Sequence, residues 1–314
     1  MLKKINFKII GMALLLAILT TNCKSSASFD KGDSVLVLKQ DQFKHYVDYF
    51  NTMEDENIKE AIPNDSAWTW MKSNIPFFEC PQYNFEEIYY YRWWSARKHI
   101  KKTPQGYAIS EFMVQRSYAD KYNMISSALG HHISEFKWLR DSNYLQQNIR
   151  LWYRGQEGKP LKKLRNFSSW NASALYSAYL VNKDKQFIED IFPDLVQEYA
   201  AWEGDRRRKD GLFWQFDVKD GMEESLSGGR KVKNARPTIN SYMFGNAQAL
   251  SKIAELKGDV PSATFFKQKA DTLQQLVQTK LWNTEDAFFE TLTEKDTIAK
   301  VREAIGFIPW YFNL

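Results

Sequence analysis

Carboxylates and aromatic side chains alternate in one polar stretch near the middle of the chain, residues 210–246. Aromatic rings stack on the apolar faces of sugar rings, while Asp, Asn and Arg bind the hydroxyls. A paired acid and base is what cleavage of a glycosidic bond requires. The stretch therefore predicts a carbohydrate site, whose candidate residues are Trp214, Asp217, Asp220, Glu223, Arg236, Asn240 and Tyr242.

Two further clusters are rich in aromatic residues. Residues 86–100 contain Arg92, Trp93 and Trp94, and Trp170 follows a short polar loop. All four residues are candidates for sugar binding. Because adjacent residues on a helix face different ways, at most one of Trp93 and Trp94 faces a pocket, and burial of both in the core is the alternative.

Helical periodicity predicts the elements that position these residues. Apolar residues recur at helical spacing over 168–181, 185–202, 239–258 and 262–282, with Ser262 as a cap of the last and Pro193 starting a new turn within the second. Two more helices are expected over 108–129 and 135–154, and strands only at 34–38 and 213–217. Helix pairs in succession predict an all-α fold, an α-solenoid or a closed toroid of hairpins.

The middle stretch resembles a signature of known glycosidases. Gly221-Met222-Glu223-Glu224-Ser225, followed by residues 236–243, is similar to the trehalase-like and family 63-like (mannosylglycerate hydrolase-like) six-hairpin glycoside hydrolases of the Bacteroidetes type. The resemblance implies an (α/α)6 toroid and inversion at an α-linked sugar. It places Glu223 on the general acid, where the family usually has Asp, with Asp220 as second choice.

An inverting hydrolase also needs a second carboxylate, roughly 6.5–9.5 Å from the acid, to activate water. In the resembled families it comes from the last hairpins. We therefore expect a domain over 34–314 that lacks about a third of the ring, with Glu290 or Glu303 as substitutes for the base. The alternative function is a glycan-binding lipoprotein or remnant enzyme without catalysis.

A third alternative is a polysaccharide lyase. Its base would be His99 or His131, beside a charge-neutralising Arg92 or Arg97. The adjacent His131 and His132 cannot both face one ion on a helix, so we expect no metal and no other cofactor. Glu135 is a further candidate for a residue that reaches the pocket.

The N-terminus carries the signature of export. Residues 1–22 have lysines, an apolar run too short to span a bilayer, and then Cys23, which predicts a lipoprotein signal peptide with Cys23 lipidated and 23–33 as a tether. Of the 43 Lys and Arg residues, three lie in this signal, and the other 40 nearly balance 38 Asp and Glu. The expected partners are therefore an oligo- or polysaccharide and the membrane of the cell envelope, not nucleic acid.

Overall fold

Helices dominate the structure, a computed structural model that describes residues 37–314. The α-helices are α2 (Lys44–Phe50), α3 (Ala67–Asn74), α4 (Tyr83–Lys98), α5 (Ser126–Phe136), α6 (Asn143–Arg154), α7 (Asn171–Asn182), α8 (Lys185–Arg206), α9 (Pro237–Lys257), α10 (Val260–Lys280) and α11 (Ile308–Tyr311). The 3-10 helices are η1 (Gln40–Phe43), η2 (Asn64–Ser66), η3 (Lys121–Asn123), η4 (Asp217–Lys219) and η5 (Ala304–Phe307). Three antiparallel ribbons pair β1 (Ile100–Thr103) with β2 (Gly106–Ile109), β3 (Trp214–Gln215) with β4 (Asn234–Ala235), and β5 (Trp282–Asn283) with β6 (Phe288–Phe289).

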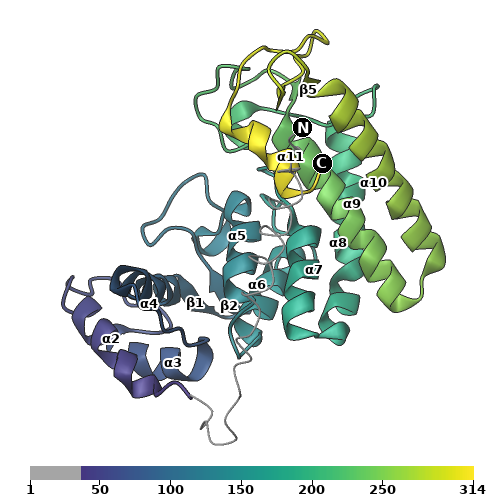
Figure 1. The fold of residues 1–314 in the computed structure, drawn as a ribbon. Coiled ribbons are helices and arrows are strands. Elements are labelled where there is room, and N and C mark those ends of the chain that lie inside the picture. Colours follow the sequence, from purple (N-terminus) through teal and green to yellow (C-terminus); the bar gives the residue numbers. More distant parts are fainter. Residues whose placement is uncertain (1–36) are drawn as a thin grey trace, which may run out of the picture. The chain divides into compact units, whose positions relative to one another are not determined.

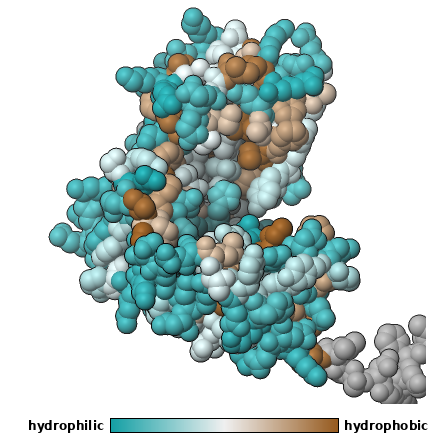
Figure 2. Space-filling view, turned by 90° about the vertical axis from the view of Figure 1, so that its left-hand side faces the viewer, coloured by the Kyte–Doolittle hydropathy of each residue, from teal (hydrophilic) through white to brown (hydrophobic). Residues whose placement is uncertain are grey.

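The helices follow one another as hairpins, α5/α6, α7/α8 and α9/α10 (Figure 1). Within this series α5 packs on α7 and α7 packs on α9, while α8 and α10 also pack on α9. This arrangement is the all-α hairpin toroid that the sequence predicts. The side of the molecule seen in Figure 2 is hollowed, and its exposed surface is mainly hydrophilic with scattered apolar residues.

Helix α9 is the central helix, because it buries most of its 21 residues and exposes one face of its second half, at Gln248, Lys252 and Glu255. Pro237 occupies its first turn, and Gly258 ends it with φ +74°, the left-handed conformation that favours glycine. At Gly245 a Cβ atom would lie 2.3 Å from the ring of Phe312. Glycine is therefore required there for the chain after α11 to pack on α9.

Two details of the predicted helix starts are wrong. Helix α8 runs unbroken from Lys185 to Arg206 with Pro193 inside it, so no new helix begins at that proline. Helix α10 is capped by Asp259, whose carboxylate accepts the N–H of Ser262 at 3.1 Å, so Ser262 is the third residue of the helix and not its cap.

The helix expected over 108–129 is also wrong. Residues up to Ile109 pair with β1 in a hairpin, and Ile109 N–H donates to Asn148. Tyr122 and Asn123 then have φ of 58° and 64°, which interrupts any helix before α5. The periodic pattern was thus overridden by strand pairing and by a left-handed turn.

The helix expected over 135–154 is two elements. Helix α5 ends at Phe136, and α6 begins only at Asn143. Between them Leu139 is buried, and the N–H of Arg140 donates to the carbonyl of Asn74 in α3 at 2.9 Å. This tertiary contact turns the chain where local periodicity alone favours helix.

Residues 40–314 form one compact unit. The predicted signal peptide, Cys23 and the tether lie outside the described residues, as do residues 34–36 of the strand expected at 34–38, and Val37 and Leu38 are not in a strand. The strand expected at 213–217 is confirmed at residues 214–215. No helix in the described part is long and apolar enough to cross a membrane.

Candidate functional site

The connection from α8 to α9, residues 207–236, is called the loop below. Asn240 in α9 stabilises it by hydrogen bonds to both of its ends. Its side-chain oxygen accepts the N–H of Phe213 at 2.7 Å, and its amide donates to the carbonyl oxygens of Phe213 and Arg236, both at 2.8 Å. Asn240 is fully buried. Sequence reasoning placed Asn240 in the sugar site; in this structure its amide joins the two ends of the connection.

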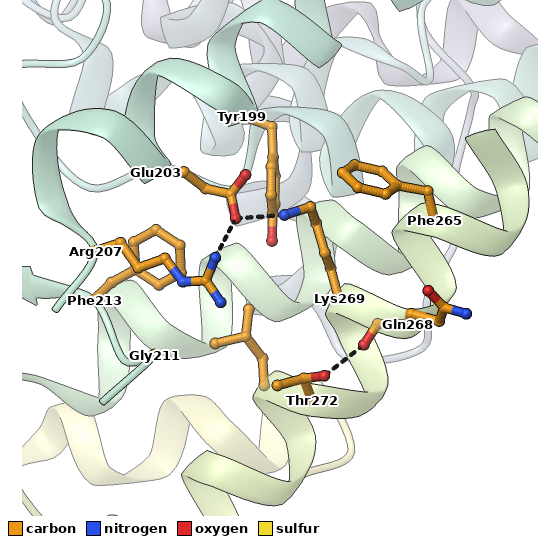
Figure 3. Close-up of a pocket in the computed structure, with 10 residues that line it drawn as sticks. Tyr199, Glu203, Arg207, Gly211, Phe213, Phe265, Gln268, Lys269 and Thr272 are labelled. Carbon is orange, nitrogen blue, oxygen red and sulfur yellow. Dashed lines mark hydrogen bonds and ion pairs between the residues drawn. The ribbon is translucent and has the colours of Figure 1, made fainter. Parts of the chain in front are cut away.

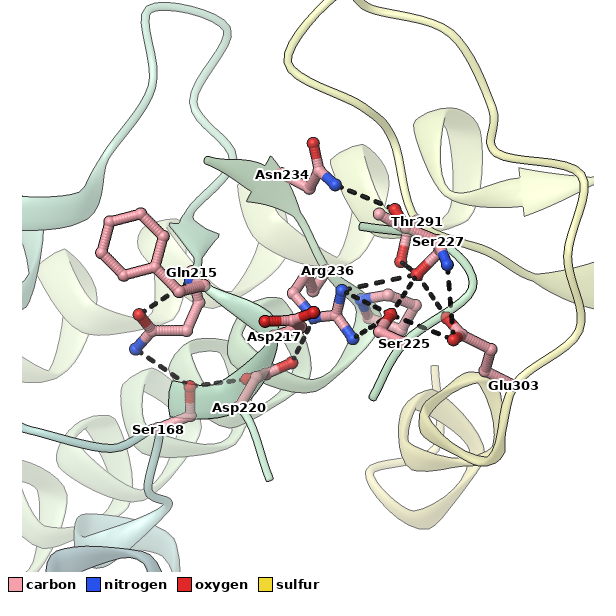
Figure 4. A network of polar contacts seen from close by, with 12 residues as sticks. Ser168, Gln215, Asp217, Asp220, Ser225, Ser227, Asn234, Arg236, Thr291 and Glu303 are labelled. Carbon is pink, nitrogen blue, oxygen red and sulfur yellow. Dashed lines mark hydrogen bonds and ion pairs between the residues drawn. The ribbon is translucent and has the colours of Figure 1, made fainter. Parts of the chain in front are cut away.

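Asp220 and Arg236 form the centre of a polar network within this connection (Figure 4). Arg236 Nε donates to Asp220 Oδ2 at 3.0 Å, and Ser168 Oγ donates to Asp220 Oδ1 at 2.6 Å. Neither side chain of the ion pair is exposed. Burial raises the pKa of Asp220 to about 6, against the opposing effects of the Arg236 charge and the Ser168 hydrogen bond. The pair therefore anchors the loop, and neither group reaches solvent.

Glu303 anchors the same loop from a point far along the chain. Its carboxylate accepts Ser225 Oγ at 3.0 Å, the N–H of Leu226 at 2.8 Å and Ser227 Oγ (Figure 4). The pKa of Glu303 lies below its ordinary value. Burial by itself would raise this pKa, but the hydrogen bonds and the charge of Arg236 together lower it by more. Glu303 thus stays ionised and fixes the segment directly after Glu223.

The other substitute base, Glu290, is placed differently. It is 1% exposed, and one carboxylate oxygen accepts the amide of Asn283 at 3.2 Å. Burial raises the pKa of Glu290. It takes no part in the network around Glu303.

Glu223 and Glu224 are the exposed carboxylates of the loop. Glu224 accepts Arg230 Nη2 at 3.1 Å, whereas no hydrogen bond to the Glu223 side chain is found among the described residues. The loop is therefore fixed on both sides of Glu223, at Asp220 and at Ser225, while the Glu223 carboxyl group stays free. The Glu223 carboxyl group is therefore accessible to a ligand and is carried on an anchored loop.

Trp170 and Tyr242, both predicted to bind sugar, lie together. Their ring centroids are 4.7 Å apart, and His131 packs edge-on against Trp170 at 4.7 Å. A Cβ atom at Gly130 would lie 2.5 Å from the Trp170 ring, so glycine makes this approach possible. Burial and the charge of Asp220 raise the pKa of Tyr242. Trp170 follows Ser168, the partner of Asp220, by two positions, so this aromatic row (His131, Trp170 and Tyr242) lies next to the polar network.

Trp214 and Asp217 have local partners. The guanidinium of Arg206 lies 4.2 Å and the ammonium of Lys233 4.7 Å from the Trp214 ring centre. Asp217 is 2% exposed and accepts the N–H of Val218 at 2.6 Å. The Trp214 ring is thus already in contact with two cations, and the Asp217 carboxylate accepts a backbone N–H within η4.

The predicted residues on α4 divide between surface and core. Arg92 is exposed and donates to Glu135 on α5, with Nη2 to Oε1 at 2.6 Å. Trp93 and Trp94 are 5% and 4% exposed, and Trp94 Nε1 donates to Asn51 at 2.7 Å. Both tryptophans are therefore core residues, which is the alternative that the sequence offered for them.

A cavity of about 130 Å³ lies between α8 and α10 (Figure 3). Within it Glu203 accepts Lys269 Nζ at 2.6 Å and Arg207 Nη1 at 3.3 Å. None of the predicted site residues lines this cavity. Its one carboxylate is neutralised by two cations, so it offers no free acid or base.

The sequence alone does not single out Ser168 or Gln215, and it offers Glu303 only as a substitute base. Ser168 and Gln215 bond each other at 3.4 Å beneath Asp220, and Glu303 lies 80 positions after Glu223. Isolated Ser, Gln and Glu residues carry no local signal. The signal that led to this network is the carbohydrate site predicted over residues 210–246.

Comparison with known proteins adds a family and a fold. The sequence profile of the mannosylglycerate hydrolase MGH1-like glycoside hydrolase domain matches residues 121–314. A solved structure described as a sialidase is 60% identical with a TM-score of 0.86, over 88% of this chain and 25% of that chain. A curated uncharacterized protein of Borreliella burgdorferi is 23% identical over 139 residues, 44% of this chain and 28% of that protein.

The crystal structure of an uncharacterized conserved protein from Thermus thermophilus has the same fold. Its TM-score is 0.53 at 13% identity, over 65% of this chain and 68% of that chain. The present chain spans about a quarter of the length of the sialidase-described structure and of the Borreliella protein.

Proposed function

Because the chain belongs to the family of mannosylglycerate hydrolase MGH1-like glycoside hydrolase domains, we propose that it hydrolyses α-linked sugars with inversion, using Glu223 as general acid. The observation that carries this proposal is the free Glu223 carboxyl group on a loop anchored at Asp220 and by Glu303. Glu223 would protonate the leaving oxygen while water attacks from the opposite face of the sugar.

The aromatic row next to this loop supports the sugar-binding part of the proposal. Trp170 and Tyr242 lie in contact beside Asp220, and we propose that Tyr242 contacts the sugar. Trp170 is 7% exposed and packs against the Tyr242 ring. The buried hydrogen bonds of Asp217, Arg236 and Asn240 indicate that these residues stabilise the conformation of the loop and do not contact the sugar.

Inversion requires a second free carboxylate to activate water. Within the described network Asp220 is ion-paired, Asp217 is buried and accepts the N–H of Val218, and Glu303 accepts several hydrogen bonds from the loop. We therefore assign the base to a carboxylate outside this network. The same observation favours the second candidate, a glycan-binding protein that keeps the pocket without hydrolysis.

The lyase alternative needs Arg97 or Arg92 near a sugar carboxylate. Arg97 is fully buried and donates to the carbonyl of Ile62 at 2.6 Å and to Asn64. It packs in the core, where a ligand cannot contact it. Arg92 is exposed and lines a cavity with His99 and His131, but its guanidinium is already paired with Glu135. The lyase alternative therefore has weaker support than either of the others.

The hydrolase proposal is tested with a panel of substrates. The panel contains mannosylglycerate, α-glucosides, α-mannosides and, because of the similar structure described as a sialidase, α-sialosides. Glu223→Gln should lower kcat by roughly 10²–10⁴-fold. The matched control Glu224→Gln changes the neighbouring exposed carboxylate and should leave kcat within about twofold. Equal activity of Glu223→Gln and Glu224→Gln would remove Glu223 from the mechanism, and binding without turnover in all proteins would favour the glycan-binding function.

We also propose that the protein is exported and lipid-anchored through Cys23. The support is the sequence pattern of residues 1–23. Radiolabelled palmitate should enter the wild-type chain in a bacterial host, and Cys23→Ser should abolish labelling. Labelling that persists in Cys23→Ser, or a chain that stays in the cytoplasmic fraction, would overturn this assignment.

A further inference from the structure

A second cavity, of about 340 Å³, lies between α4 and α5, outside the connection that carries Glu223. Its volume is at the lower end of the range of small-molecule sites. Its wall comes from both helices and from the segment after β2. The residues that matter for its chemistry are Tyr91, Arg92, His99, Glu111, His131 and Glu135.

Each carboxylate of this cavity has one engaged and one free oxygen. Glu135 Oε1 accepts Arg92 Nε and Nη2 at 3.1 and 2.6 Å, and Glu111 Oε2 lies 3.1 Å from His132 Nε2. Among the described residues, no hydrogen bond is found to the other oxygen of either Glu, and none is donated by Arg92 Nη1. The wall therefore presents free acceptors beside a free donor.

The imidazoles add groups of both kinds. His99 Nδ1 lies 2.9 Å from the carbonyl oxygen of Ser110, and since a carbonyl only accepts, Nδ1 carries the proton. Burial lowers the pKa of His99, so its ring is neutral near pH 7 and Nε2 is an acceptor. Burial and the charge of His132 also lower the pKa of His131, which then offers one donor and one acceptor.

We propose that this cavity is an additional sugar-binding subsite that takes one neutral pyranose unit. Every sugar hydroxyl both donates and accepts, which suits a wall of alternating donors and acceptors. Two carboxylates against one guanidinium disfavour an anionic ligand. Tyr91 is 41% exposed and provides an aromatic face for the apolar side of the ring.

The cavity adjoins the proposed catalytic region through His131. That ring lines the cavity and packs on Trp170, which contacts Tyr242. We infer that a glycan bound at Tyr242 extends past the Trp170 ring, so that its neighbouring unit occupies the cavity. This extension along one glycan rests on the proposed function, whereas sugar binding in the cavity does not.

The four histidines of the chain make a direct test possible. His99, His131 and His132 line the cavity, and His45 is an exposed residue on α2 outside it. Histidine-selective NMR of the full chain is recorded during titration with methyl α-mannoside, methyl α-glucoside and methyl β-galactoside. We expect saturable shifts of the three cavity histidines with roughly millimolar dissociation constants, and an unchanged His45.

Two variants on α4 form a matched pair. Ser95→Phe fills the cavity and should weaken binding at least roughly tenfold, whereas Asn84→Phe adds the same side chain outside the lining and should not. Unperturbed cavity histidines, equal affinity in Ser95→Phe, or a preference for glycerate or methyl α-sialoside would each overturn the proposal.

Hydrolysis by the same proteins separates the two proposals. Turnover of the substrate panel without histidine shifts would refute the subsite and leave the hydrolase function standing. Histidine shifts without any turnover would support the subsite and refute the hydrolase function. Glu223→Gln should keep the shifts, because Glu223 does not line the cavity.

Discussion

Arg236 Nε lies 3.0 Å from Asp220 Oδ2, and both side chains are fully buried at the start of α9. A buried pair is costly to break, because removing one partner leaves an uncompensated charge. We expect Arg236→Met or Asp220→Asn to lower the free energy of unfolding by about 3–5 kcal/mol, and the double variant to lose much less than the sum. Urea denaturation followed by circular dichroism measures all three, and additive losses would show that the two groups act independently.

The anchoring of the Glu223 loop by Glu303 predicts a change in protease sensitivity. Glu303→Ala removes the acceptor of Ser225, Leu226 and Ser227, so residues 225–233 should open more often. Trypsin, which cuts after Arg230 and Lys231, should cleave the native variant roughly tenfold faster than wild type. Its control is Glu285→Ala, which removes an exposed partner of Lys300. Cleavage at the wild-type rate in Glu303→Ala would contradict the anchoring role.

Two glycines on helices should respond to alanine in opposite directions. Gly130→Ala places a Cβ atom 2.5 Å from the Trp170 ring and should lower the free energy of unfolding by about 1–3 kcal/mol. Gly204→Ala in α8 meets no atom within 4 Å and should raise that free energy by about 0.5–1 kcal/mol. Thermal denaturation of both variants decides the matter, and stabilisation by Gly130→Ala would mean that the Trp170 ring is not packed there.

Glu198 gives stability a pH dependence. It is 7% exposed, accepts Tyr153 Oη and the Asn171 amide, and burial raises its pKa to about 6 from an ordinary 4.5. Because the folded state holds the proton more tightly, this contribution to stability is complete below about pH 4.5 and is lost as the pH rises through 6. The loss amounts to about 2 kcal/mol.

Glu198→Gln tests that contribution. Urea denaturation from pH 4 to 8 should show a smaller fall in unfolding free energy for Glu198→Gln than for wild type. Glu255→Gln, which changes an exposed glutamate on α9, should reproduce the wild-type curve. Parallel curves for Glu198→Gln and wild type would exclude Glu198 as the source of the pH dependence.

The sequence by itself determined the helical hairpins and the region of the site. Apolar periodicity marks α9 and Gly258 marks its end, because a helix that packs against several neighbours repeats apolar residues along its length and ends readily at a glycine. The polar 210–246 stretch also identified the connection that the structure anchors at both ends.

The tertiary structure decided which of the polar residues are buried in ion pairs and which are exposed to a ligand. Asp220 and Glu223 are both acidic and three positions apart, yet one is buried against Arg236 and the other is exposed. That difference depends on Ser168 and Glu303, which lie 52 and 80 positions from them. The cavity between α4 and α5 likewise unites residues that are far apart in the chain. Local patterns record the propensity of a segment, but burial and ion pairing are properties of what folds against it.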